Sequence, residues 1–272
     1  MAEISAKVVM ALRNETGLSM MECKKALEET GGDAEKAKDL LRKKLKGKMD
    51  SRTDRAAGEG RIGVAIAPEG RAGAIVEIRA ETDFTAKNDA FVKAVDSIAK
   101  LALAAHDGTV SATPEMSKLI DELRITTGEN ISIARVHKVS GGGSAMFGSY
   151  VHHDGKTGVL LMGEGSVSQD LARDVCMHIA ASPTPPQGVS ANDIPANIVE
   201  KERSFRISQA MDSGKPKEIA EKMVEGGMRK FFEEIALLEQ PFIRDETKKI
   251  KDLFPKGATV SSFFRWKVGE EA

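Results

Sequence analysis

The fold is decided by Gly63-Val64-Ala65-Ile66-Ala67-Pro68-Glu69-Gly70-Arg71-Ala72-Gly73-Ala74-Ile75-Val76, because its glycine pattern returns further along the chain as Gly148-Ser149-Tyr150-Val151-His152-His153-Asp154-Gly155-Lys156-Thr157-Gly158-Val159-Leu160-Leu161. The three glycine pairs are each 85 residues apart, and an acid–Gly–base triplet sits in the middle of both copies. Each copy predicts a strand, a tight turn and a second strand. Apolar residues at helical spacing follow in 91–103 and 171–180. The sequence therefore predicts an α+β fold with two related antiparallel β-β-α subdomains.

Outward from the first copy, the segment between hairpin and helix reads Glu81-Thr82-Asp83-Phe84-Thr85-Ala86-Lys87-Asn88. A turn between a strand and a helix tends to be exposed, and an exposed Phe is costly unless something binds it. The alternative is that Phe84 folds back over the sheet edge as a packing residue. At the corresponding positions the second copy carries Val167-Ser168-Gln169, with nothing apolar in place of Phe84. This difference favours a contact residue.

The residues before the first copy predict a small bundle of three helices over 1–47. Gly17 ends the first helix, and Ser19 with Glu22 forms a capping box for the second. Met20 and Met21 are neighbours on that second helix and point in different directions, so at least one should be exposed.

A basic run over residues 42–55 leads from the bundle into a predicted linker, 48–60. Its cations are Arg42, Lys43, Lys44, Lys46, Lys48, Arg52 and Arg55. Such a run is typical of a solvated helix end, where cations are favoured. The alternative is an RNA-associated factor that uses these residues on phosphates, in which case binding would fall steeply with salt.

The remaining domains follow from turn signals. The first core subdomain is predicted over 61–140, with a helix that opens at Thr113-Pro114 and ends at Gly128. The second covers 141–189 and 241–272, interrupted by a helical (coiled-coil) hairpin over 190–240. One expectation is that this hairpin packs on its own subdomain, and the other is that it contacts a partner or a second copy.

Composition narrows the function classes. The 272 residues carry a formal net charge of -1 with only 4% aromatic residues, which argues against a general nucleic-acid or membrane binder. The two cysteines have no ligand spacing and fit free thiols in a reducing compartment. The start has no apolar leader and no stretch approaches a membrane span, so we expect a cytoplasmic protein.

Catalytic motifs are not apparent in the sequence, so neither a metal nor a cofactor is expected. His152 and His153 would point to opposite faces of a strand and could not chelate one metal. Cys176 and His178 are two residues apart on a helix, which also separates their directions. An enzyme would need a pocket that assembles His152, His178 and Cys176.

Two longer motifs carry a resemblance to a known family. One is Leu12-Arg13-x-x-Thr16-Gly17-x-x-Met20-Met21-x-Cys23-Lys24-Lys25-Ala26-Leu27, and the other runs from Glu77 through Thr82-Asp83-Phe84-x-Ala86-Lys87. Gly128-Glu129-Asn130-Ile131, Gly148-Ser149-Tyr150-x-His152 and residues 213–223 add to it. The chain resembles the bacterial translation elongation factor Ts family over nearly its whole length. Members of this family are the guanine-nucleotide exchange factors of elongation factor Tu.

The resemblance implies a ubiquitin-associated-like (UBA-like) N-terminal bundle, the two-subdomain core and the hairpin insertion. It also implies a non-enzymatic factor that binds elongation factor Tu near its magnesium site and does not bind nucleotide itself. Oligomeric state is left open between one copy, a homodimer and a heterotetramer with the partner. Family members often continue with a further C-terminal helix, whereas this chain stops after Trp266–Ala272, which puts that contact in doubt. The implied partner contacts are Arg13, Met20, Met21, Lys24, Thr82, Asp83, Phe84, Gly128 and His152.

Overall fold

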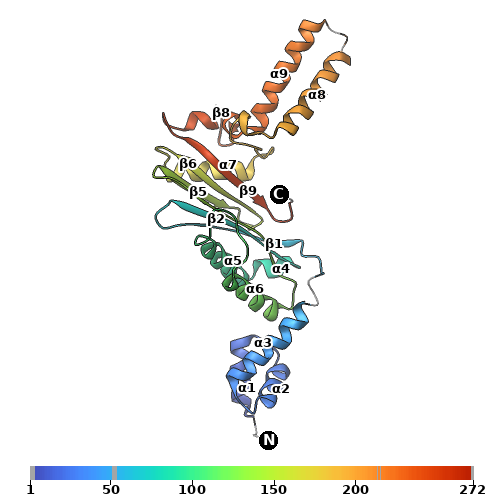
Figure 1. Ribbon diagram of the computed structural model, residues 1–272, viewed down its shortest axis with the longest axis vertical. Coiled ribbons are helices and arrows are strands. Elements are labelled where there is room, and N and C mark those ends of the chain that lie inside the picture. The colour runs from blue at the N-terminus through green and yellow to red at the C-terminus, as the bar shows by residue number, and fades with distance from the viewer. Residues whose placement is uncertain (1–3, 51–53, 213, 215, 271–272) are drawn as a thin grey trace. The chain divides into compact units, whose positions relative to one another are not determined.

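The computed structural model describes residues 4–50, 54–212, 214 and 216–270 (Figure 1). Contacts divide the chain into two compact units, each described by itself below. The first comprises Met1–Gly63, Val76–His137 and Val268–Ala272, and the second comprises Val64–Ile75 and Lys138–Lys267. The domain boundaries expected at residues 47, 60, 140, 189 and 240 stay predictions.

Three helices form the N-terminal bundle: α1 (Ala6–Thr16), α2 (Met20–Glu29) and α3 (Ala34–Asp50). Gly17 ends α1 with a left-handed φ of 70°, and Ser19 with Glu22 forms the predicted capping box at α2. The helix α3 continues past residue 47 and ends at Asp50. The buried core of the bundle is Val9, Leu12, Leu18, Cys23, Ala26, Leu27, Ala37 and Leu41.

The first sheet has the strand order β1-β2-β4-β3. Its strands are β1 (Glu59–Ile66), β2 (Ala72–Ala80), β3 (Gly108–Thr109) and β4 (Ser132–Ser140), and its helices are α4 (Asp83–Lys87), α5 (Asp89–Ala102) and α6 (Pro114–Thr127). Thr113 caps α6 and Gly128 ends it, as the sequence predicts. Helix α5 lies against β1 so closely that a Cβ on Gly63 would be 2.5 Å from Val95 Cγ1.

The second sheet has the order β5-β6-β9, with both pairs antiparallel. Its strands are β5 (Ala145–Val151), β6 (Thr157–Glu164) and β9 (Thr259–Lys267), and α7 (Gln169–Ala181) packs on β5 and β6. Ala145 pairs with Glu164 and Val151 with Gly158, which makes β5 and β6 the hairpin predicted from the repeat. The buried core of this layer is Val159, Leu161, Val167, Ala172, Val175, Cys176, Ile179, Leu237, Phe242, Ile250 and Val260.

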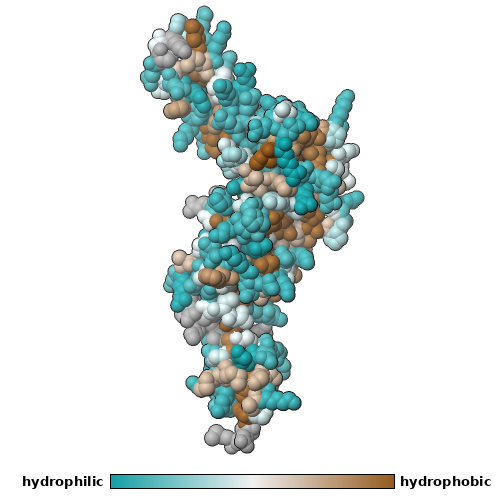
Figure 2. All heavy atoms as spheres, turned by 180° about the vertical axis from the view of Figure 1, so that it is seen from behind, coloured by the Kyte–Doolittle hydropathy of each residue, from teal (hydrophilic) through white to brown (hydrophobic). Residues whose placement is uncertain are grey.

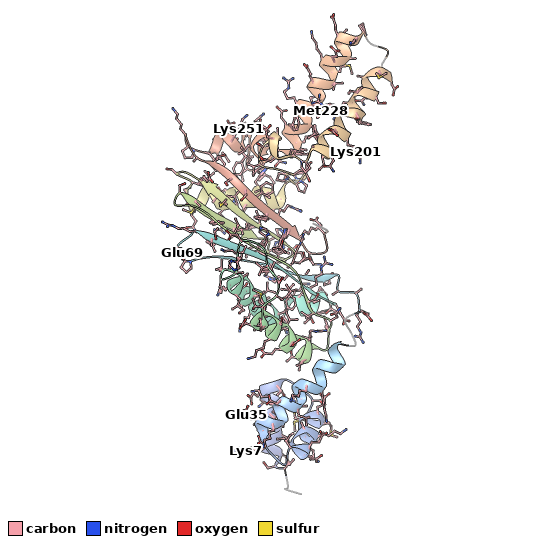
Figure 3. The ribbon with its side chains drawn as sticks, viewed as in Figure 1. Lys7, Glu35, Glu69, Lys201, Met228 and Lys251 are labelled. Carbon is pink, nitrogen blue, oxygen red and sulfur yellow. The ribbon has the colours of Figure 1, made fainter. Side chains whose placement is uncertain are left out.

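A helical hairpin is formed by α8 (Ala196–Asp212) and α9 (Lys217–Ile235), preceded by the 3-10 turn η1 (Ala191–Asp193). The two helices run side by side (Figure 1). Met228 on α9, labelled in Figure 3, and Ala210 on α8 are both buried. Hydrophobic side chains remain exposed between the hydrophilic ones over the hairpin (Figure 2): Phe205, Ile207, Met211, Ile219 and Met223.

Residues 236–240 lie outside the helical hairpin, although the predicted insertion extends to residue 240. Ala236, Leu237 and Gln240 are buried, and Leu237 N donates to Gly188 O at 2.9 Å. The segment therefore packs within the second unit. It is followed by short elements: η2 (Leu237–Glu239), β7 (Pro241–Phe242), β8 (Asp245–Lys249) and η3 (Ile250–Leu253).

The two copies of the repeat turn in the same way. Gly70 and Gly155 have φ values of 71° and 73°, the left-handed region that favours glycine. Figure 3 labels Glu69 at the tip of the first hairpin. A mixed fold of helices and antiparallel strands is confirmed, whereas the UBA-like character of the bundle stays a prediction. Within the described ranges, none of the helices has the length and apolar character needed to cross a bilayer.

Candidate functional site

The segment after β2 holds Phe84 at the surface. Its side chain is 83% exposed, so it does not pack over the sheet edge, and its role as a contact residue stays a prediction. The segment is not the open turn expected from sequence, because Asp83–Lys87 forms the one-turn helix α4. Thr82 caps this helix by accepting a hydrogen bond from Thr85 N at 3.3 Å.

The neighbours of Phe84 explain its orientation. Thr85 and Ala86 are buried at 8% and 5% exposure, so the opposite face of the short helix carries Phe84 into solvent. Asp83 accepts from Lys87 Nζ at 2.6 Å, one helical turn away. An exposed pair of this kind adds little stability, so it does not hold the helix by itself.

A carboxylate that the sequence reasoning did not single out lies beside this helix. Glu129 accepts hydrogen bonds from Thr82 N, Thr82 Oγ1 and Thr85 Oγ1 at 3.1, 2.7 and 2.7 Å. Gly128, a predicted partner contact, has a left-handed φ of 73° and turns the chain so that Glu129 can reach across. The available signal was an acid directly after a helix-ending glycine, in the motif Gly128-Glu129-Asn130.

The bundle offers a second apolar surface. Met20 and Met21 are 38% and 63% exposed, so both, and not only one, lie at the surface of α2. Lys24 lies one turn after Met20 on the same helix and contacts Glu28 at 3.8 Å. Arg13 is exposed near the end of α1. Adaptable Met side chains beside cations suit a protein interface.

His152 lies in the second unit, and its geometry corrects an expectation. Strand β5 ends at Val151, so strand alternation does not apply, and the His152 and His153 rings lie 4.2 Å apart. His152 Nδ1 is 3.1 Å from Asp154 Oδ1. Partial burial raises the pKa of the Asp154 carboxyl, but hydrogen bonds from Lys156 N and His152 outweigh it and hold that pKa below its usual value. No group of three metal-binding side chains occurs among the described residues.

Cys176 and His178 are both buried on α7. His178 Nε2 is 2.9 Å from Gln240 Oε1, and Ile243 N donates to His178 Nδ1 at 3.2 Å. Burial raises the pKa of the Cys176 thiol, which makes it unreactive. Burial of Cys176 and the hydrogen bonds of His178 give these side chains structural roles, which weighs against the enzyme alternative.

The basic run 42–55 is partly committed to ion pairs. Lys44 Nζ lies 2.6 Å from Glu29 Oε2, and Arg55 Nη1 lies 3.5 Å from Glu81 Oε2. The side chains of Arg42, Lys46 and Lys48, and residue Arg52, lie outside the described residues. What is described fits a helix end and connection better than a phosphate-binding surface.

The structure thus brings Thr82, Asp83, Phe84 and Gly128 together around Glu129. It places the bundle residues and His152 on separate elements.

Comparisons with known proteins all give the same family. The family model described as Elongation factor TS matches residues 81–270. Elongation factor Ts of Alkalilimnicola ehrlichii is 42% identical over 275 residues, covering 98% of this chain and 92% of the relative. The Hyphomonas neptunium protein of the same name is 42% identical, covering 99% and 93%. That of Psychrobacter sp. is 39% identical, covering 99% and 92%.

Proposed function

Because the chain belongs to the elongation factor Ts family, we propose that it is the exchange factor that releases GDP from elongation factor Tu. Family membership makes it a factor of translation elongation in protein biosynthesis. Its action takes place in the cytoplasm, where elongation occurs. It binds the GTPase and not the nucleotide, and it needs no cofactor.

The function requires no chemistry on the factor's side. An exchange protein that binds the nucleotide-free partner more tightly than the GDP-bound partner lowers the affinity of that partner for GDP. The two ratios are equal, because the two binding equilibria are linked. A coupling of about 3 kcal/mol would weaken GDP by roughly 100-fold. Residues that bind elongation factor Tu and displace parts of its nucleotide site are therefore sufficient for exchange.

The observation that carries the proposal is Phe84, 83% exposed on a helix whose other face is buried. Such a side chain can act as a wedge, since packed elements shift between discrete positions when a group is inserted. Asp83 beside it supplies a polar group to the same region of the GTPase. Magnesium neutralises phosphate charge in that site, so disturbing its surroundings loosens GDP.

The exposed residues of the bundle are the anchor that keeps the wedge in place. Met20 and Met21 supply apolar area, and Arg13 and Lys24 supply charge at its rim. Gly128 and His152 are further contact positions. A contact surface built on two or more separate elements allows affinity and exchange rate to be changed independently.

The test is release of mantGDP from elongation factor Tu with and without this protein, followed by stopped-flow fluorescence. The wild-type chain accelerates release, Phe84→Ala loses most of that acceleration, and Gln169→Ala keeps it. Gln169 is the matched control because it is exposed at the position of the second copy that corresponds to Phe84. Release at the intrinsic rate with wild-type chain would refute the proposed function.

A further inference from the structure

Helix α4 is too short to hold its own shape. It has five residues, and helices need several turns before propagation offsets the cost of nucleation. Its internal support is the cap at Thr82, the backbone bonds from Ala86 N to Thr82 O at 3.2 Å and from Asn88 N to Thr85 O at 3.1 Å, and the exposed pair of Lys87 and Asp83. The conformation that exposes Phe84 therefore depends on contacts from outside the helix.

Glu129 supplies such contacts from 44 to 47 residues away in the sequence. Its Oε2 accepts from Thr82 N, and its Oε1 accepts from the hydroxyls of Thr82 and Thr85. An ionised carboxylate only accepts hydrogen bonds, and bonds to it are shorter and stronger than those between neutral groups. The three donors belong to the residues on either side of Asp83 and Phe84, so one side chain fixes both ends of that pair.

The Thr82 hydroxyl transmits this contact to the cap. A hydroxyl has a single proton, and here it is directed at Glu129 Oε1 at 2.7 Å. A lone pair of the same oxygen is then left to accept from Thr85 N at 3.3 Å. Glu129 thus sets the hydroxyl orientation that caps α4.

Glu129 is itself held in place. Its backbone N donates to Thr127 Oγ1 at 3.3 Å, directly after the left-handed Gly128. In the opposite direction, Asn130 N donates to Glu81 Oε1 at 2.6 Å. Each segment therefore offers an acid that accepts a backbone N–H of the other, which locks the two segments in register.

From this geometry we infer that Glu129 is the positioning residue of the exchange site, acting only through Phe84. The inference rests on the proposed function and adds a residue to it. Without the carboxylate, the short helix loses its cap orientation and Phe84 samples other directions. If one molecule in ten keeps the active orientation, the exchange rate falls about 10-fold.

The test is a double-mutant cycle of Glu129→Ala and Phe84→Ala, read as the maximal rate of mantGDP release at saturating factor. Glu129→Ala alone lowers the maximal rate about 10-fold, while the half-saturating concentration changes less, because the bundle contacts remain. In the Phe84→Ala background, Glu129→Ala has no further effect. Glu115→Ala, the same charge change at the exposed start of α6, keeps the wild-type rate.

Amide hydrogen exchange supplies a readout that does not depend on the partner. Glu129→Ala speeds exchange at Thr85 and Ala86 while the amides of α5 stay protected. If Glu129→Ala fails to melt cooperatively, Glu129→Gln, which keeps the size and one acceptor oxygen, carries the same cycle with a smaller effect.

The outcomes separate the two ideas. A wild-type rate for Phe84→Ala would overturn both the proposed wedge and the positioning role. A slow Phe84→Ala together with a wild-type rate for Glu129→Ala, or with additive effects in the double mutant, would overturn the positioning role alone. Unchanged amide exchange in α4 would also overturn it.

Discussion

In the first hairpin–helix copy, α5 approaches the strands at Gly63, and in the second, α7 approaches them at Gly148. An added Cβ would lie 2.5 Å from Val95 Cγ1 in the first case and 2.6 Å from Ala172 Cβ in the second. The same glycine of the pattern thus permits the same close packing in both copies. The turns also match, with left-handed glycines at the tips.

The copies differ where the strand leads into the helix. The first inserts α4 and exposes Phe84, whereas in the second α7 follows β6 with Val167 buried and Gln169 exposed. Packing is repeated, and the exposed aromatic is not. The second copy packs without an aromatic residue at this position, so packing does not account for Phe84. We explain it by contact with a molecule outside the chain.

The largest expected effect separates exchange from stability at Phe84. Phe84→Ala should lower the rate of GDP release between about 10-fold and about 100-fold, if the wedge supplies most of a typical coupling free energy. The free energy of unfolding should change by less than about 0.5 kcal/mol, as for other surface substitutions. Thermal melting and stopped-flow release, measured on one sample, check both.

Phe91 provides the matched control, since it is fully buried on α5 in the same copy. Phe91→Ala should cost about 3–5 kcal/mol of stability and reduce exchange only in proportion to the unfolded fraction. An early-melting Phe84→Ala that exchanges normally per folded molecule would make Phe84 a packing residue and remove the contrast between the copies.

The next effect tests whether the first copy acts without the bundle that precedes it. Changing both Met20 and Met21 to Ala should weaken binding to elongation factor Tu by about 1–3 kcal/mol, the range for interface anchors. The maximal exchange rate should change less than the affinity. Titration calorimetry measures the affinity. Met116→Ala, which removes a buried Met side chain of α6, is the control for a loss of binding that results from unfolding. Unchanged affinity would exclude the bundle surface as an anchor.

A smaller effect should be common to the two copies. Gly63→Ala and Gly148→Ala each force a methyl group against the packed helix and should cost about 1–3 kcal/mol. Gly148→Ala should be the worse, because Ala172 backbone atoms lie 2.9 and 3.0 Å away and cannot rotate aside. Gly142→Ala, which meets nothing within 4 Å, is the neutral control. Urea unfolding measures all three, and a neutral Gly148→Ala would break the proposed equivalence.

Local signals predicted most of the elements. The capping box of Ser19 and Glu22, the helix-ending Gly17 and Gly128, and the Thr113 cap all depend on neighbours in sequence. The long-range contact of Glu129 with Thr82 could not be predicted in this way, because its partners are brought together by the folded sheet.

Two expectations fail, the first for a long-range reason and the second for a local one. The sequence predicts a turn before Asn88, but Asp83–Lys87 forms one helical turn whose conformation depends on the distant Glu129. The opposite directions expected for His152 and His153 required a strand through both residues, but β5 ends at Val151. The end of a strand is hard to predict where the residues that follow it directly are not glycine or proline. A wrong strand end then gives wrong predicted directions for the side chains beyond it.

The smallest expected effect is a pH dependence of the stability of the second copy. His178 is buried on α7, and the residue 85 positions earlier on α5 is the exposed Lys93. Ile243 N donates to Nδ1, so the proton is on Nε2 and is donated to Gln240 Oε1. Gln240 Nε2 in turn donates to Thr184 O and Glu234 O. A second ring proton would face the N–H of Ile243.

Burial therefore lowers the pKa of His178, although the hydrogen bond with Gln240 partly opposes this. Below the unfolded value of about 6.5 the unfolded chain takes up a proton that the folded chain refuses, so stability is complete above that pH and falls as the pH drops. The slope for one group is at most about 1.4 kcal/mol per pH unit. Between pH 7 and 5, the amide protection factors of α7, in which the intrinsic pH dependence of exchange is divided out, should fall while those of α5 stay constant, and His178→Asn should remove the difference. Equal acid sensitivity of the two helices would mean that His178 is not its source.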